Sequence, residues 1–185
     1  MGIVDPYVLN VRSFIKDTFS KAPDAVDLGC GDFNVGRRIR SAADHYVACD
    51  VVPAMIEYNR VAYAVEDVDF RVLDIVTAEL PPGDVVFIRQ VLQHLSNKQI
   101  SDFLPKLGQY QWAIITEHIP FDDPFTPNHD ILTGNVRVMF NSGVELTEPP
   151  FNLVYYDKKV LCELRAKDGR IRTVAYQLQD TNQRS

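Results

Sequence analysis

Residues 26–36 read Val26-Asp27-Leu28-Gly29-Cys30-Gly31-Asp32-Phe33-Asn34-Val35-Gly36. A short apolar run ends here in two glycines, and a segment with helical character follows. Glycines suit such a turn because they adopt positive φ angles and let a ligand approach the backbone closely. In open α/β sheets, ligands bind at the carboxyl ends of the strands, where this turn would lie. The stretch therefore predicts a strand, a ligand-binding loop and a helix in succession.

The rest of the chain repeats this alternation of strands and helices. Hydrophobic periodicity predicts an amphipathic helix over 8–21, strands at 25–28, 45–50, 68–73, 85–88 and 112–116, and helices at 35–43, 54–65 and 97–107. Ser96 and Gln99 have the spacing of a capping box at the start of the last helix. Strands that alternate with helices form a parallel sheet, because right-handed crossovers place the helices on both faces.

Near the C-terminus the pattern changes. Two apolar runs flank Asp168-Gly169, which is a strong signal for a hairpin. We therefore expect an α/β fold, a Rossmann-like three-layer sandwich whose mostly parallel, seven-stranded sheet ends in an antiparallel hairpin strand. The whole chain, residues 1–185, is expected to form a single domain.

Between the fifth strand and the hairpin lies a long segment, residues 118–159, with five prolines. Loops of this length inside compact domains are usually functional. Within this segment, Val136, Val138 and Phe140 alternate as a short additional strand would.

Composition limits the possible partners. The net charge of −6 argues against a polyanionic substrate, because nucleic-acid binders usually carry a basic patch. The three cysteines form no C-x-x-C pair, so neither a zinc site nor a disulfide framework is indicated. No stretch approaches the ~20 apolar residues of a membrane helix, and the N-terminus does not resemble a signal peptide. We expect a cytoplasmic protein without a nucleic-acid or membrane partner; the oligomeric state leaves no signature.

Acidic residues at three strand ends indicate the ligand. A dinucleotide fingerprint would place a glycine at position 34, where this chain has Asn34. Asp27 is a poor neighbour for a diphosphate but can pair with an ammonium group. Asp50 can accept hydrogen bonds from ribose hydroxyls, and Asp74 is placed for an adenine amino group. Each acid alone is also a common turn former. Together they favour a phosphate-free nucleoside with a cationic amino-acid portion.

On these residues the chain resembles the class I S-adenosylmethionine-dependent methyltransferases over nearly its whole length. Asp27-Leu28-Gly29-Cys30-Gly31 is similar to the family's glycine-rich first motif, and the segment 89–95 to the one that lines the cofactor after strand four. The resemblance implies S-adenosylmethionine as the cofactor and a seventh strand inserted antiparallel beside the fifth. It implies cofactor contacts from Asp27, Gly29, Cys30, Gly31, Asp50, Val51, Asp74, Ile75, Arg89 and Gln90. It also implies that residues 118–159 cover the substrate, because the short region before the first strand reduces the N-terminal cover usual in that family.

The implied reaction is an in-line displacement of a methyl group from sulfonium, for which the protein must hold the reactants ~3 Å apart and aligned. An alcohol acceptor would also gain from a general base, and His94 is the predicted catalytic residue. The alternative for His94 is a helix-entry histidine bonded to backbone. Substrate contacts are predicted from Tyr7, Glu117, His118 and His129. No metal is predicted, because strand four ends without the carboxylate of metal-assisted family members.

The sequence thus predicts methyl transfer to a small molecule, at oxygen, because the N/D-P-P-Y/F-type motif for amino-group targets is absent after strand four. Two alternatives stay open. One is a non-catalytic module that binds S-adenosylmethionine or S-adenosylhomocysteine and acts through a partner. The other is a nicotinamide-dependent reductase, which Asn34 disfavours.

Overall fold

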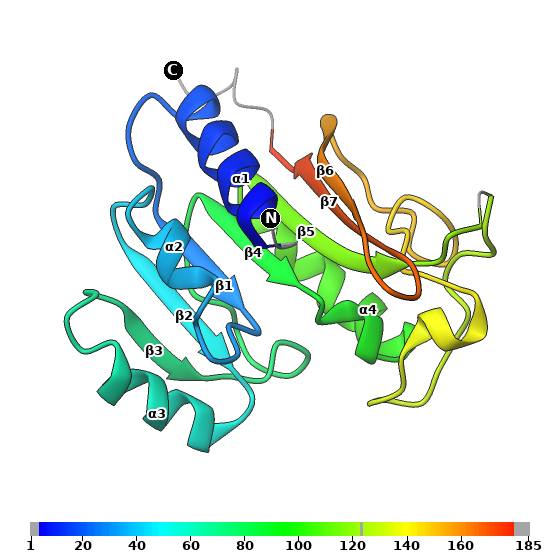
Figure 1. Ribbon diagram of the computed structural model, residues 1–185, viewed down its shortest axis with the longest axis horizontal. Coiled ribbons are helices and arrows are strands. Elements are labelled where there is room, and N and C mark those ends of the chain that lie inside the picture. The colour runs from blue at the N-terminus through cyan, green and yellow to red at the C-terminus, as the bar shows by residue number, and fades with distance from the viewer. Residues whose placement is uncertain (1–3, 123, 180–185) are drawn as a thin grey trace.

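The computed structural model describes residues 4–122 and 124–179. These residues contain one seven-stranded sheet with the order β3-β2-β1-β4-β5-β7-β6. The strands are β1 Ala25–Leu28, β2 Tyr46–Asp50, β3 Asp69–Val72, β4 Val85–Arg89, β5 Trp112–Ile119, β6 Asp157–Arg165 and β7 Arg170–Gln177. The first five run parallel, and β7 pairs antiparallel with both β5 and β6 (Figure 1). This confirms the predicted fold, including the inserted hairpin strand.

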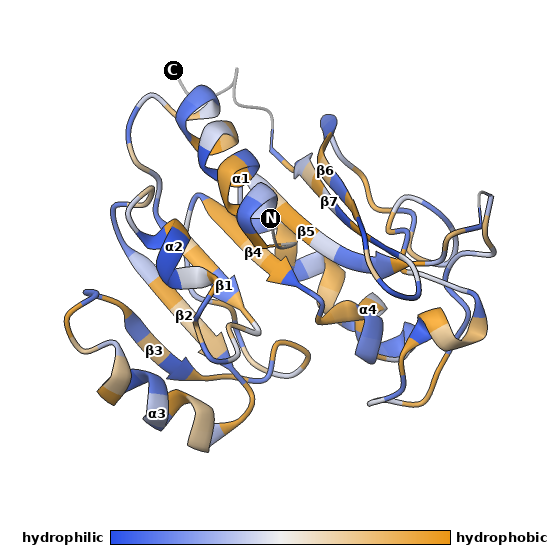
Figure 2. Cartoon of the chain, viewed as in Figure 1, coloured by the Kyte–Doolittle hydropathy of each residue, from blue (hydrophilic) through white to orange (hydrophobic). Residues whose placement is uncertain are grey.

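Helices cover both faces of the sheet. They are α1 Val4–Thr18, α2 Gly36–Arg40, α3 Pro53–Ala62 and α4 Asn97–Phe103, with short 3₁₀ helices η1 Leu92–His94, η2 Leu104–Gln109 and η3 Arg137–Phe140. One buried cluster joins the sheet to α1, α2 and α3, and a second joins its other face to α4 and η2. Figure 2 shows that β4 and the first part of β5 are hydrophobic, because both faces of these strands are covered, whereas the ends of both strands are hydrophilic. The predicted three layers are therefore present.

Several boundaries differ from the prediction, and three of these differences have clear local reasons. Helix α1 begins at Val4 rather than at residue 8, with Pro6 in its first turn, where a missing N–H costs no helical bond. The predicted helix 97–107 keeps its capping box between Ser96 and Gln99 but leaves α-geometry after Phe103, beside Pro105. Strand β5 continues to Ile119 because β7 pairs with it that far. We call the remaining segment between β5 and β6, residues 120–156, the connection.

The predicted short strand around Val136, Val138 and Phe140 is wrong. These residues lie at η3, a 3₁₀ helix that ends at Asn141 in the left-handed conformation. The Asn141 N–H donates to the Val138 carbonyl at 3.1 Å, so the segment satisfies its backbone by turning on itself. The alternation of three apolar residues was not sufficient to predict a strand, because a strand also needs a neighbouring strand to satisfy its backbone hydrogen bonds.

Candidate cofactor site

The glycine loop after β1 has a geometry that requires glycine. Gly29 has φ +80° and Gly31 has φ +53°. A Cβ atom on Gly29 would lie 2.3 Å from Cγ2 of Val91, in the turn that follows β4. The N–H groups of Gly29 and Cys30 both donate to the Cys49 carbonyl, at 2.8 and 2.9 Å. The loop is therefore bonded to β2 on one side and packed against the turn after β4 on the other.

Polar side chains hold the second glycine from two directions. The Gly31 N–H donates to Oδ2 of Asp50 at 3.0 Å, and its carbonyl accepts from Nδ2 of Asn59 at 2.7 Å. The other Asp50 oxygen accepts from the Val52 N–H at 3.0 Å. Asn59 is fully buried, and sequence reasoning missed it. The available signal was an amide three residues after Ile56, on the face that α3 buries.

A cavity of about 210 Å³ opens beside this loop. Of the predicted site residues, the structure brings together Tyr7, Asp27, Gly29, Cys30, Gly31, Arg89 and Gln90. Its other lining residues, which the sequence did not single out, are Asp32, Val35, Gly36, Ile39, Tyr46 and Phe87. Tyr7 comes from α1, so the N-terminal helix contributes to the walls of the site.

Opposite charges line this cavity. Asp27 is only 7% exposed, and its Oδ2 accepts from the Tyr46 hydroxyl at 3.1 Å. Burial raises the pKa of Asp27 to about 7, although the Tyr46 bond and the nearby Arg89 charge act in the opposite direction. The Arg89 guanidinium lies 5.4 Å from the centre of the Tyr7 ring. Its Nε is buried and has no hydrogen-bond partner among the described residues. A carboxyl group and an unsatisfied cation therefore line the same small space.

The predicted nucleoside contacts lie outside the residues that line the cavity. Asp50 ends β2, where Val51 is 61% exposed. Asp74 follows β3 and is engaged in its own turn, where it accepts from the Val76 N–H and the Thr77 hydroxyl at 2.9 and 3.0 Å. The Ile75 side chain is buried in the core. Their proposed contacts with ribose and adenine stay predictions.

His94 and Glu117 both contact Gln93 of η1, and neither lines the cavity. Nδ1 of His94 is 3.2 Å from the Asn135 carbonyl, so this ring has the backbone contact of the alternative interpretation. Nε2 is 3.1 Å from Nε2 of Gln93. Glu117 accepts from the Leu92 and Gln93 N–H groups, and burial raises its pKa to about 8. The catalytic role of His94 stays a prediction.

The other two histidines predicted to contact substrate, His118 and His129, also lie outside the cavity. Nε2 of His118 is 3.3 Å from Oδ1 of Asp168, in the hairpin turn. His129 is exposed in the connection and stacks on Phe140, with ring centres 5.3 Å apart. The structure therefore does not gather Glu117, His118 and His129 around one substrate position.

Comparisons with known proteins agree with this architecture. A family model described as a methyltransferase domain matches residues 26–110, which include the glycine loop and the turn after β4. No curated protein sequence matches the chain. Among the helices of residues 4–122 and 124–179, none is both long and apolar enough to cross a membrane.

Solved structures share the fold at low sequence identity. N-methyltransferase NodS from Bradyrhizobium japonicum WM9, in complex with S-adenosyl-L-homocysteine, is 11% identical with a TM-score of 0.69, over 97% of this chain and 89% of that one. The methyltransferase domain of bacterial CtHen1 is 14% identical with a TM-score of 0.68, over 96% and 100%. An S-adenosylmethionine-dependent methyltransferase from Leishmania major is 16% identical with a TM-score of 0.68, over 95% and 73%. Residues 26–110 are thus similar to a methyltransferase domain, and the chain shares the fold of these methyltransferase structures over nearly its whole length.

Proposed function

We propose that this enzyme transfers the methyl group of S-adenosylmethionine to an oxygen atom of a small molecule. The observation that carries the proposal is the cavity beside Gly29, which Asp27 and Arg89 both line. The amino-acid end of the cofactor carries an ammonium and a carboxylate. We assign the ammonium to Asp27 and the carboxylate to Arg89, whose Nε has no described partner. A diphosphate would meet the Asp27 carboxyl instead, which argues against a dinucleotide.

The nucleoside end would extend along the carboxyl ends of β2 and β3. A carboxylate has about four acceptor positions, so Asp50 can accept from ribose hydroxyls beside its bonds to Gly31 and Val52. We assign the adenine to the side of Asp74 and its neighbour Ile75, with Val51, which follows Asp50, between ribose and adenine.

When bound, S-adenosylmethionine supplies a methyl group on a good leaving group, so the chain mainly needs to orient the acceptor. Tyr7 lines the cavity and is the best supported of the proposed substrate contacts. For His94 to act as general base, one ring nitrogen must exchange its present contact with Gln93 or Asn135 for the acceptor hydroxyl.

Two features support this choice of acceptor, one for its size and one for the atom that is methylated. The net charge of −6 is unfavourable for a nucleic-acid backbone. Strand β4 ends at Arg89, and the residues that follow it lack the N/D-P-P-Y/F-type motif of amino-group targets, which favours oxygen as the acceptor atom. A cytoplasmic location and the absence of nucleic-acid partners are part of this proposal.

The test is methyl transfer itself. We would incubate the protein with S-adenosylmethionine carrying a ¹³C-methyl group and pools of hydroxyl, carboxyl and amino compounds, with RNA and DNA oligonucleotides in parallel. We expect release of S-adenosylhomocysteine with at least one hydroxyl or carboxyl compound, and an NMR shift of the new methyl group typical of attachment to oxygen. The Gly29→Ala variant serves as the inactive control. Transfer only to nitrogen, or only to a nucleic acid, would overturn the proposal.

A further inference from the structure

Two buried ionisable residues outside the cavity bind the backbone of the same residue, Leu92. Arg137 is 0% exposed and Glu117 is 4% exposed. The Leu92 N–H donates to Oε1 of Glu117 at 3.1 Å, and the Leu92 carbonyl accepts from Nη1 of Arg137 at 2.9 Å. Buried charges destabilise a fold unless hydrogen bonds satisfy them. Here Glu117 accepts from the N–H groups of Leu92 and Gln93, and the Leu92 carbonyl is one of three acceptors of Arg137.

Arg137 joins this turn to two other segments. Its Nε donates to the His129 carbonyl at 3.0 Å, within the connection, and its Nη2 donates to Oδ1 of Asn97 at 2.8 Å, at the start of α4. The planar guanidinium can satisfy three acceptors in different directions, which a lysine ammonium would do less well. The Gly134 N–H also donates to the His94 carbonyl at 2.8 Å. Residues 129–142 are thus attached to η1 at several points.

The same turn reaches the proposed cofactor site within two residues. Gln90 lines the cavity, and its N–H donates to the Thr116 carbonyl at 2.7 Å. Val91 lies so close to Gly29 that no Cβ atom fits between them. Leu92, which Glu117 and Arg137 bind, is the next residue in the chain. A ligand that favours one position of Gln90 and Val91 therefore also acts on Leu92.

We propose that Glu117 and Arg137 form a clamp on Leu92 that couples occupation of the cofactor cavity to the ordering of residues 129–142. In this account they are positioning residues, because they act through η1 and not on the reacting atoms. Coupling is reciprocal: if ordering of residues 129–142 favours ligand binding by a given free energy, ligand binding favours that ordering by the same free energy. The inference rests on the proposed cofactor site and extends it to the segment that we expect to cover the substrate.

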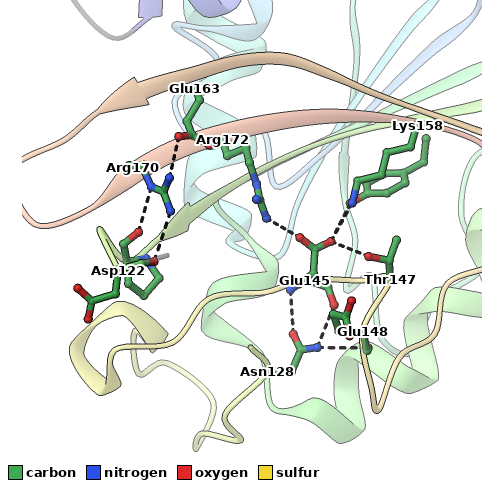
Figure 3. Close-up of polar contacts among 11 residues, drawn as sticks. Asp122, Asn128, Glu145, Thr147, Glu148, Lys158, Glu163, Arg170 and Arg172 are labelled. Carbon is green, nitrogen blue, oxygen red and sulfur yellow. Dashed lines mark hydrogen bonds and ion pairs between the residues drawn. The ribbon is translucent and has the colours of Figure 1, made fainter. Parts of the chain in front are cut away.

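A second polar cluster offers a matched control. Glu145, also in the connection, pairs with Arg172 of β7 at 2.5 Å and with Lys158 of β6 at 3.3 Å (Figure 3). Its carboxylate also accepts from the Thr147 hydroxyl at 3.0 Å. These bonds attach the connection to the hairpin rather than to η1. Loss of Arg172 should therefore loosen the connection without interrupting the path from the cavity.

The experiment is residue-resolved hydrogen exchange with and without S-adenosylhomocysteine. In the wild-type protein we expect the ligand to slow exchange about 10-fold at Gly134 and Ser142, as well as at Gly31. In Arg172→Met this slowing should persist. In Arg137→Met and in Glu117→Gln it should fall below about two-fold at Gly134 and Ser142, while Gly31 stays protected.

The outcomes separate the clamp from the cofactor site. Protection of Gly31 without protection of Gly134 in the wild-type protein would overturn the clamp alone. So would full protection in Arg137→Met. If that variant does not fold, Arg137→Lys keeps the charge but loses the planar fork, and wild-type coupling in it would also overturn the clamp. Absence of any protection at Gly31 would reject the cofactor site, and the clamp with it.

Discussion

The glycine loop and the connection lie near the same end of the sheet but are held in different ways. In the loop, backbone conformation decides the shape, because Gly29 has a positive φ and no room for a side chain. In the connection, hydrogen bonds of buried polar side chains determine the shape. Asn128 is 5% exposed, and its Nδ2 donates to the carbonyls of Glu145 and Pro149, both at 2.9 Å. A regular scaffold thus forms the cofactor side, and a network of side-chain bonds shapes the proposed substrate side.

The largest expected difference in affinity is between two glycine variants, one in the glycine loop and one in the connection. Gly29→Ala introduces a Cβ atom 2.3 Å from Val91 and a left-handed conformation, so we expect affinity for S-adenosylhomocysteine to fall on the order of 100-fold. Gly134→Ala, at φ +93° with open space around the new Cβ, should cost about 1–2 kcal/mol of unfolding free energy and leave affinity nearly unchanged. Calorimetry and thermal denaturation of both variants measure these effects. Equal losses of affinity would remove the distinction between the regions.

The next effect is a pH dependence that belongs to the cofactor side. The pKa of Asp27 is raised to about 7, so its carboxyl group loses the charge that would pair with an ammonium as the pH falls below that value. We expect affinity for S-adenosylhomocysteine to rise on the order of 20-fold between about pH 5.5 and about pH 7.5. The stability of the ligand-free protein changes in the opposite direction and falls as the pH rises. The contribution of Asp27 to stability is present below its unfolded pKa of about 3.9 and is lost as the pH rises through about 7.

Asp27→Asn should abolish this pH dependence of binding while it keeps the side-chain shape. The measurement is a calorimetric titration series across the pH range for both proteins. If the variant retained the wild-type profile, another group would be responsible and Asp27 would not hold the ammonium.

A smaller effect is expected at Asp50, where loop and ligand share one carboxylate. Asp50→Ala removes the acceptor of the Gly31 N–H as well as the proposed ribose contact. We expect about a 10-fold loss of affinity for S-adenosylhomocysteine, consistent with one or two charge-assisted hydrogen bonds. To separate the two roles, calorimetry would compare S-adenosylhomocysteine with its 2′-deoxy analogue. A wild-type ratio between these ligands in the variant would show that Asp50 does not bind ribose.

The smallest effect on affinity is expected from the connection. Asn128→Ala removes the donor of several partly buried hydrogen bonds to backbone carbonyls and should lower the unfolding free energy by about 2 kcal/mol. Affinity for S-adenosylhomocysteine should stay within about two-fold, because the side chain bonds only within the connection. Denaturant unfolding and calorimetry on the same preparation provide both values. A large loss of affinity would mean that the two regions depend on each other beyond the clamp at Leu92.

The same contrast explains what the sequence could predict. Strand β1, the glycine loop and the hairpin follow from apolar periodicity and from glycine and turn residues, which act over a few neighbouring positions. Asp27 and Arg89 reach one cavity because β1 and β4 are adjacent parallel strands, and the alternating pattern already implied such a sheet. The strands and the glycine loop around the cavity were therefore largely predictable, whereas the cofactor contacts of their residues stay predictions.

Other parts depend on partners far apart in the chain. Arg137 contacts Leu92 and Asn97, 45 and 40 residues away, and no local pattern indicates that it is buried. Asn59 supports Gly31 from 28 residues away in the same manner. The predicted strand near Val136 failed for this reason, since the conformation there follows from long-range bonds of polar side chains.

The most direct test of the proposed cofactor site compares two ligands in one calorimetric experiment. S-Adenosylhomocysteine and 5′-methylthioadenosine share the nucleoside, but only the first has the amino-acid end assigned to Asp27 and Arg89. We expect S-adenosylhomocysteine to bind on the order of 100-fold more tightly, and this advantage to shrink to about 10-fold or less in Arg89→Met. Equal affinity of the wild-type protein for the two ligands would contradict the assignment of the cavity.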